Sequence, residues 1–144
     1  MQQRLLDRLD KRYLAYFAYI IIDETLWVSN ARFNGIYAID LVTGKSEFKG
    51  RIPFYPDEFV GMHAYVKRQE QYLIFFPQQG KSVDIYDMET GNIQSYPIKE
   101  WAGTSNHYCV AGIVQREDVF WMFPRFTNKP LITFSLKQRK FERI

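Results

Sequence analysis

Hydrophobic and polar residues alternate with a period of two over most of the chain, which is the spacing of half-buried β-strands. Each alternating run is short and ends at turn-forming residues. In the first third of the sequence the runs are separated by Asp23-Glu24, by a loop around Asn30 and by Thr43-Gly44. They predict four strands, at residues 16–23, 25–29, 36–41 and 46–52.

The same order of strands and turns returns twice, at a spacing of about 47 residues. Leu26 aligns with Leu73, and Thr43-Gly44 aligns with Thr90-Gly91, whereas Phe76-Pro77 aligns with Phe123-Pro124 further along. We therefore divide the chain into repeats at about 14–60, 61–107 and 108–144. The later repeats predict strands at 62–66, 71–76, 82–87 and 92–97, and at 108–115, 118–123, 131–136 and 140–144.

The last hairpin differs from its two counterparts. Gly44 and Gly91 supply the positive φ that a short hairpin loop requires, and Asp40 and Asp87 precede them as hydrogen-bond acceptors at the turn entry. The third copy, at 136–140, contains no glycine. A looser hairpin, or one of another geometry, is expected there.

Repeats of this length, each a four-stranded antiparallel meander, are typical of a β-propeller, in which the repeats form blades around an axis. The predicted fold class is therefore all-β and propeller-type, with three four-stranded blades forming a half propeller or a fragment of a longer one. Residues 14–144 make up this domain. Residues 1–13 form an N-terminal amphipathic segment, predicted to be a short helix because Leu5, Leu9 and Tyr13 recur at helical spacing.

The run from Gly35 to Lys45 resembles the core of quinoprotein-type propeller repeats, in which a Tyr-Ala-hydrophobic-Asp segment leads into a Thr-Gly turn. The run from Val83 to Asn92 is a weaker match. The tryptophan that follows the Thr-Gly turn in that family is absent here, with Phe48 and Tyr96 nearby instead. The resemblance implies blade architecture without quinone chemistry, and Kelch-like propellers are a comparison of equal standing.

Composition fits this reading, because 47% hydrophobic and 17% aromatic residues exclude a disordered chain. The net charge is +3, but acidic and basic residues are interspersed, so no nucleic-acid partner is expected. The longest apolar run, Tyr13 to Ile22, is about ten residues and too short to span a bilayer. A single cysteine, Cys109, and the lack of a glycosylation acceptor favour a cytoplasmic location.

Three blades leave two blade faces open, since closed propellers use about four to eight blades. Two occupants are expected. Either a second copy associates about a twofold axis and completes a six-bladed ring, or the remaining blades belong to a longer chain. The function that follows is a non-catalytic binding or protein-interaction module.

Ligand contacts are expected on the face that carries the connections between blades and between the second and third strands of each blade. A tryptophan beside small polar residues suits a protein or carbohydrate ligand, and exposed arginines suit a carboxylate or phosphate. The candidate ligand-binding residues are Arg32, Asn34, Trp101, Asn106, His107 and Arg125.

An enzyme, for example one acting on carbohydrate, is the alternative function. Such an enzyme needs converging carboxylates, and the loop face offers Asp57, Glu58 and Glu100. His63 and His107 supply two imidazoles, fewer than a zinc site requires. No nucleophile or phosphate-loop motif is present, so neither a catalytic residue, nor a metal, nor a cofactor is predicted.

Overall fold

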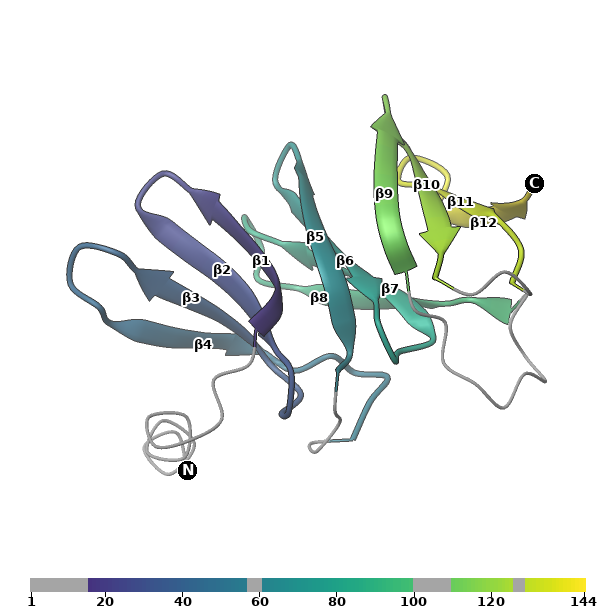
Figure 1. Cartoon of the computed structure of the whole chain (residues 1–144). Helices are drawn as coiled ribbons and strands as arrows, with labels where there is room; N and C mark the ends of the chain where they lie inside the picture. Colours follow the sequence, from purple (N-terminus) through teal and green to yellow (C-terminus); the bar gives the residue numbers. More distant parts are fainter. Residues whose placement is uncertain (1–15, 57–60, 100–109, 126–128) are drawn as a thin grey trace.

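The computed structural model describes residues 16–56, 61–99, 110–125 and 129–144, which form three four-stranded antiparallel sheets (Figure 1). The predicted all-β, partial-propeller fold is confirmed. The three sheets fall inside the three predicted repeats. The predicted helix at residues 1–13 lies outside the described residues.

Each sheet follows the chain order of its strands, from an inner strand to an outer one. The first sheet consists of β1 (Tyr16–Ile22), β2 (Thr25–Asn30), β3 (Ile36–Asp40) and β4 (Ser46–Gly50). The second consists of β5 (His63–Gln69), β6 (Tyr72–Pro77), β7 (Ser82–Asp87) and β8 (Ile93–Pro97). The third consists of β9 (Val110–Arg116), β10 (Val119–Pro124), β11 (Ile132–Ser135) and β12 (Lys140–Arg143).

Strand β5 is longer than the sequence predicted. It was expected to end at Val66, where charged residues begin, but it continues to Gln69. Lys67 pairs with Ile74 of β6, and the ladder holds to the end of the strand. Charged side chains are compatible with a strand here because their polar ends reach solvent past the neighbouring sheet.

The last hairpin does not differ in geometry from its counterparts, contrary to the expectation from its missing glycine. Arg139 takes the place of Gly44 and Gly91 and adopts the same left-handed conformation, with φ of 56° against 70° and 74°. Its N–H donates to the carbonyl of Ser135 at 2.9 Å, as that of Gly44 does to Asp40 at 2.8 Å. The reason for its tolerance lies in its side chain.

The guanidinium of Arg139 lies over the ring of Tyr72, 4.8 Å from the centroid, and 5.8 Å from that of Tyr96. Both rings belong to the second sheet, so the contact fastens the third hairpin to its neighbour. A cation over an aromatic face gains about 0.5–2 kcal/mol. This gain offsets the cost of about 1–2 kcal/mol for a left-handed non-glycine residue.

Replacing Arg139 by Ala is expected to lower the free energy of unfolding by about 1–2 kcal/mol, because the ring contacts are lost and the strained φ remains. Arg139→Gly loses the same contacts but relieves the backbone, and is expected to be more stable than Arg139→Ala. Urea unfolding of both variants measures the difference. A glycine variant less stable than the alanine variant would show that φ at this position carries no strain.

The sheets stack in chain order with their inner strands β1, β5 and β9 nearest one another (Figure 1). We call the side of a sheet that looks toward the next sheet in the chain its downstream face, and the opposite side its upstream face. In the first sheet, the β1–β2 and β3–β4 hairpins lie at one end of the strands and the β2–β3 loop lies at the other. No helix among the described residues is long and apolar enough to cross a membrane.

Two hydrophobic clusters join the three sheets. The first sheet's downstream face packs on the second sheet's upstream face, where Leu73 and Phe75 are 0% exposed. The second sheet's downstream face packs on the third sheet's upstream face, where Phe76 and Phe120 lie 5.3 Å apart between ring centroids. Because β6 is buried on both sides, hydrophobic residues occupy both its upstream and its downstream positions from Leu73 to Phe76.

Candidate functional site

Asn34, one of the candidate ligand-binding residues, is 4% exposed and bound to backbone. Its Nδ2 donates to the carbonyls of Ile52 and Tyr55, each at 2.8 Å, and its Oδ1 accepts from the N–H of Ile52 at 2.7 Å. These bonds use both donors of the amide. Asn34 therefore holds the connection between the first and second sheets against the β2–β3 loop.

The two candidate arginines occupy equivalent loops and are both exposed. Arg32 follows β2 and Arg125 follows β10. The other candidates, Trp101, Asn106 and His107, lie outside the described residues, as do the carboxylates of Asp57, Glu58 and Glu100. Within the described part of the chain, the structure therefore does not assemble the predicted ligand site from several candidates.

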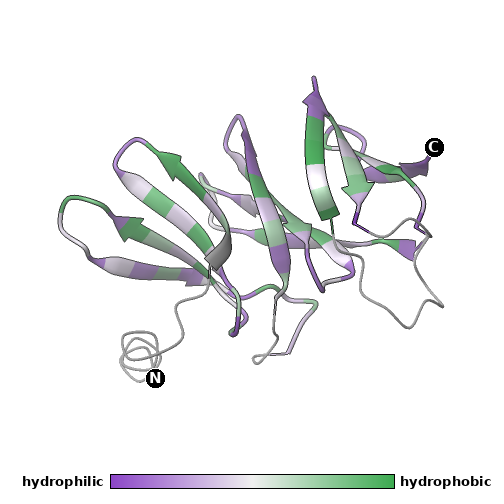
Figure 2. Ribbon diagram, in the orientation of Figure 1, coloured by the Kyte–Doolittle hydropathy of each residue, from purple (hydrophilic) through white to green (hydrophobic). Residues whose placement is uncertain are grey.

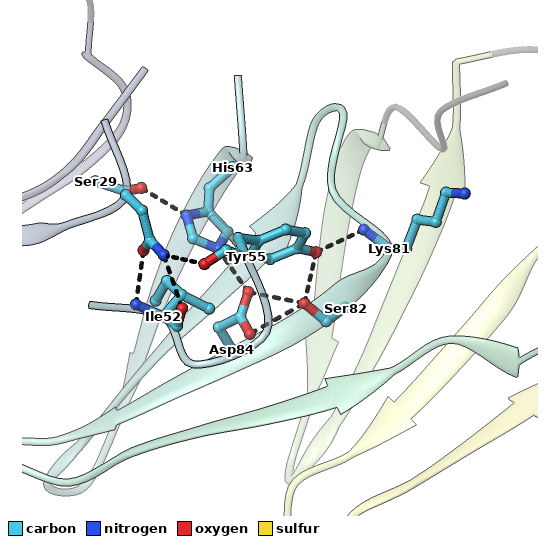
Figure 3. A network of polar contacts seen from close by, with 8 residues as sticks. Ser29, Ile52, Tyr55, His63, Lys81, Ser82 and Asp84 are labelled. Carbon is cyan, nitrogen blue, oxygen red and sulfur yellow. Dashed lines mark hydrogen bonds and ion pairs between the residues drawn. The ribbon is translucent and has the colours of Figure 1, made fainter. Parts of the chain in front are cut away.

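A buried polar network that the sequence did not predict joins the first two sheets (Figure 3). The Oγ of Ser29, at the end of β2, lies 2.6 Å from Nδ1 of His63, and Nε2 of His63 lies 2.8 Å from Oδ2 of Asp84. Ser82 Oγ donates to both carboxylate oxygens at 3.0 Å. Ser29 is 2%, His63 3% and Asp84 0% exposed.

The network continues from Ser82 toward the connection between the first two sheets. The hydroxyl of Tyr55 lies 2.7 Å from Ser82 Oγ and accepts the N–H of Lys81 at 2.6 Å. Since the Ser82 hydroxyl donates to Asp84, the Tyr55 hydroxyl donates to Ser82. Every hydrogen bond in this branch thus points toward the carboxylate of Asp84, which is how a buried anion is stabilised.

Ser29, His63 and Asp84 stand in the hydrogen-bonded order of a serine hydrolase triad. A nucleophile must reach its substrate, however, and here the serine and its base are buried between two sheets. We interpret the network as a polar cross-link that fixes the register of the first sheet on the second. Among the described residues, no three His, Cys, Asp or Glu side chains are grouped as metal ligands.

His63, one of the two imidazoles in the sequence, lies between the first two sheets. Both of its ring nitrogens are engaged between the sheets, and its ring packs 5.2 Å from that of Phe75. The available signal was Asp84, a charged residue inside the apolar run of β7. A buried carboxylate requires a buried hydrogen-bonding partner. The sequence contains only two histidines, so His63 was one of few candidates for a histidine partner.

Burial raises the pKa of Tyr55 to about 12, and the nearby charge of Asp84 adds to the effect. Because the folded-state pKa is above the unfolded one, the stabilising contribution is complete below pH 10 and is lost as pH rises toward 12. By pH 11, about one unit above the ordinary pKa of tyrosine, Tyr55→Phe is expected to remove about 1.4 kcal/mol of the alkaline loss of stability. Urea unfolding at pH 8 to 11, in about unit steps, measures this; equal alkaline slopes for both proteins would contradict it.

The downstream face of the third sheet has no sheet packed on it in the described part of the chain. Phe123 is 42% and Val114 54% exposed on this face, and Trp121 lies between them in the ladder as the partner of Val114. Phe76, the counterpart of Phe123 in the second sheet, is 0% exposed. Figure 2 shows the hydrophobic positions of β9 and β10.

Among the described residues, no sheet packs on the upstream face of the first sheet either, and we call these two end faces the open faces. Val28 and Tyr37, in the outer part of the first sheet's face, are nevertheless 0% and 2% exposed. Tyr19 is 62% and Ile21 58% exposed, whereas Val66, the counterpart of Tyr19 in the second sheet, is 7% exposed. The outer part of this face forms a third hydrophobic cluster. Its members all come from the first sheet and its β2–β3 loop and are Leu26, Val28, Phe33, Tyr37, Ile39 and Phe48.

At two positions of the inner strands, an open face carries a hydrophobic residue where a covered face carries a charged one. Ile21 of β1 corresponds to Arg68 of β5, and Val114 of β9 corresponds to Lys67 of β5. A sheet face selected to remain in water would be expected to carry charges at its exposed positions. The two open faces carry the hydrophobic residues Ile21 and Val114 at these positions instead.

No protein-family model and no curated protein match the sequence. Solved structures do match the fold. A computationally designed protein, Ika4, aligns over 93% of this chain and 74% of its own, with a TM-score of 0.59 and 10% identity. U3-55K aligns over 94% of this chain and 41% of its own, with a TM-score of 0.64 and 11% identity.

The extracellular domain of a hybrid two-component system from B. thetaiotaomicron also aligns, over 88% of this chain, with a TM-score of 0.61 and 15% identity. This chain spans only 16% of that protein's chain. At these identities the similarity extends to the fold. The chain is thus a propeller-like stack of three sheets that corresponds to part of larger structures.

Proposed function

We propose that the chain is a non-catalytic protein-interaction module that binds through the open faces of its two end sheets. The observation that carries this proposal is the exposure of Phe123 and Tyr19, whose counterparts in the middle sheet are buried. Removing apolar surface from water contributes about 25 cal/mol per Å². A face covered by a partner thus gains the stabilisation that the same side chains provide inside the stack.

The test places a photo-crosslinking phenylalanine analogue at position 123, with the analogue at position 42 as the control. Val42 is 70% exposed at the tip of the β3–β4 hairpin and belongs to neither open face. We expect capture of a protein at position 123 alone. The captured protein, once identified and purified, is expected to bind the chain and to bind Phe123→Asp at least about tenfold more weakly, a loss of about 1.4 kcal/mol.

Equal capture at both positions, or equal affinity for the wild-type chain and Phe123→Asp, would contradict this function. Both the cross-linking and the affinity measurement alter one side chain, Phe123, on the downstream face of the third sheet. Circular dichroism checks that Phe123→Asp folds. A strand signal equal to that of the wild type shows that the sheets remain intact.

We also propose that the repeats are quinoprotein-like in blade architecture, as the sequence resemblance implies. The turn that carries the resemblance supports this. Asp40 Oδ1 accepts the N–H groups of Val42 and Thr43, both at 2.8 Å, and Gly44 closes the turn with φ of 70°. Asp87 makes the equivalent bonds in the second repeat. The proposal concerns blade construction and includes no quinone cofactor.

A further inference from the structure

We propose that the partner bound by the open faces is a second copy of the chain, joined about a twofold axis into a closed ring of six sheets. This inference rests on the proposed interaction function and specifies its partner. Its basis is the order in which the sheets already pack within one chain.

Both sheet contacts inside the chain bring a downstream face onto an upstream face. After these two contacts, one downstream face remains open on the third sheet and one upstream face on the first. A single chain therefore carries both halves of the same kind of contact. A second copy related by a twofold axis pairs each open face with its complement and leaves none uncovered.

The internal contacts also predict which residues meet across the ring. Phe76 packs on Phe120 of the next sheet, and the repeat counterparts of these two residues at the open faces are Phe123 and Leu26. Trp27 packs on Tyr86 of the next sheet at 5.3 Å between ring centroids. Their counterparts at the open faces are Trp121 and Ile39. Both predicted pairs join two large hydrophobic side chains.

The size of the contact is sufficient for a stable dimer. If each open face buries on the order of 500 Å², the two contacts together remove about 2,000 Å² from water, which is the range of stable homodimers. Six sheets also fall inside the range of about four to eight that closed propellers use.

Sedimentation velocity of the purified chain at micromolar concentration tests the proposal. We expect a particle of twice the chain mass of 17.2 kDa. Each contact of the ring joins one downstream face to one upstream face, so Phe123→Asp and Ile21→Asp each disrupt both contacts of a homodimer. Each variant alone is therefore expected to weaken dimerisation at least about tenfold. Val42→Asp, at the exposed hairpin tip, is the control and is expected to sediment as the wild type does.

Mixing the two variants distinguishes this ring from other dimers. In the mixture, the upstream face of Phe123→Asp and the downstream face of Ile21→Asp are both intact, so one contact forms and mixed dimers reappear. A dimer that pairs two downstream faces would be insensitive to Ile21→Asp, and one that pairs two upstream faces would be insensitive to Phe123→Asp. Either result would overturn the proposed ring.

A monomeric wild-type chain would also overturn the inference. If that monomer binds another protein captured through position 123, the proposed function holds and only the identity of the partner changes. A full chain that is monomeric, but dimerises after deletion of residues 1–13, would assign the upstream face to that segment and likewise contradict the ring. If the monomer binds nothing through position 123, both proposals fail together.

Discussion

Replacing Asp84 by Ala is expected to lower the free energy of unfolding by about 3–5 kcal/mol, because the buried groups that bind its carboxylate are left without an acceptor. Nε2 of His63 and the hydroxyl of Ser82 both lose their acceptor. Neither group can turn to solvent, since His63 is 3% and Ser82 0% exposed. Urea unfolding followed by circular dichroism measures the loss.

The control for this substitution is Glu89→Gln, which removes a negative charge from the exposed β7–β8 hairpin. It is expected to change stability by less than about 0.5 kcal/mol. A second comparison separates the cross-link from packing. The double variant His63→Phe with Asp84→Leu replaces the pair by apolar groups and is expected to be more stable than Asp84→Ala. A loss of under about 1 kcal/mol for Asp84→Ala would show that the network does not support the fold.

Truncation of Phe76 to Ala is expected to cost about 3–5 kcal/mol, the cost typical of a large aromatic side chain removed from a core. Its ring is 0% exposed and packs on Phe120 between the second and third sheets. The measurement is again urea unfolding. A cost near zero would mean that these two sheets are not packed through this cluster.

Phe123→Ala is the matched substitution at the same position of the next repeat. Within one chain Phe123 is 42% exposed, so its truncation is expected to cost under about 1.5 kcal/mol in a monomer. Phe76→Ala and Phe123→Ala are each combined with Ile21→Asp, which opens the proposed ring. The free energy of unfolding of these variants gives the cost of each truncation in the monomer. In the wild-type background, Phe123→Ala is expected to cost more than in the monomer, and this cost depends on protein concentration. The cost of Phe76→Ala is expected in both the wild-type and the Ile21→Asp background.

The strands were predictable from the sequence because they depend on local signals. Alternation identified all twelve strands, to within a few residues at their ends, and the hairpin turns followed from Asp40, Gly44 and their counterparts. The repeat also indicated how many sheets to expect. These features require only the neighbouring residues in the chain, which one sequence displays directly.

Contacts between sheets were harder to predict, because they join residues far apart in sequence. Ser29 and His63 meet only once the first two sheets are stacked. Asn34 was assigned to ligand binding because its loop lies on the expected binding face, yet its amide satisfies backbone groups of the segment that follows the first sheet. A polar side chain in a loop does not reveal whether its partner is a ligand or the chain itself.

Arg139 illustrates the same limit for turns. Local rules disfavour arginine in a left-handed position, but here Tyr72 and Tyr96 of the neighbouring sheet stabilise its side chain. The candidate residues Trp101, Asn106 and His107 lie outside the described residues, so their role in ligand binding stays a prediction.

Thiol cross-linking between copies, with a bismaleimide that spans the roughly 10 Å between facing sheets, tests most directly whether the downstream face of the third sheet packs on the upstream face of the first. Cys109, the single native cysteine, is first replaced by Ser in every chain. One preparation then carries Phe123→Cys and another Leu26→Cys, the pair that corresponds to the contact of Phe76 with Phe120. Phe123→Cys mixed with Val42→Cys is the control. The proposed ring predicts that the bismaleimide links the first mixture into a covalent dimer much faster than the control, and equal rates in the two mixtures would contradict it.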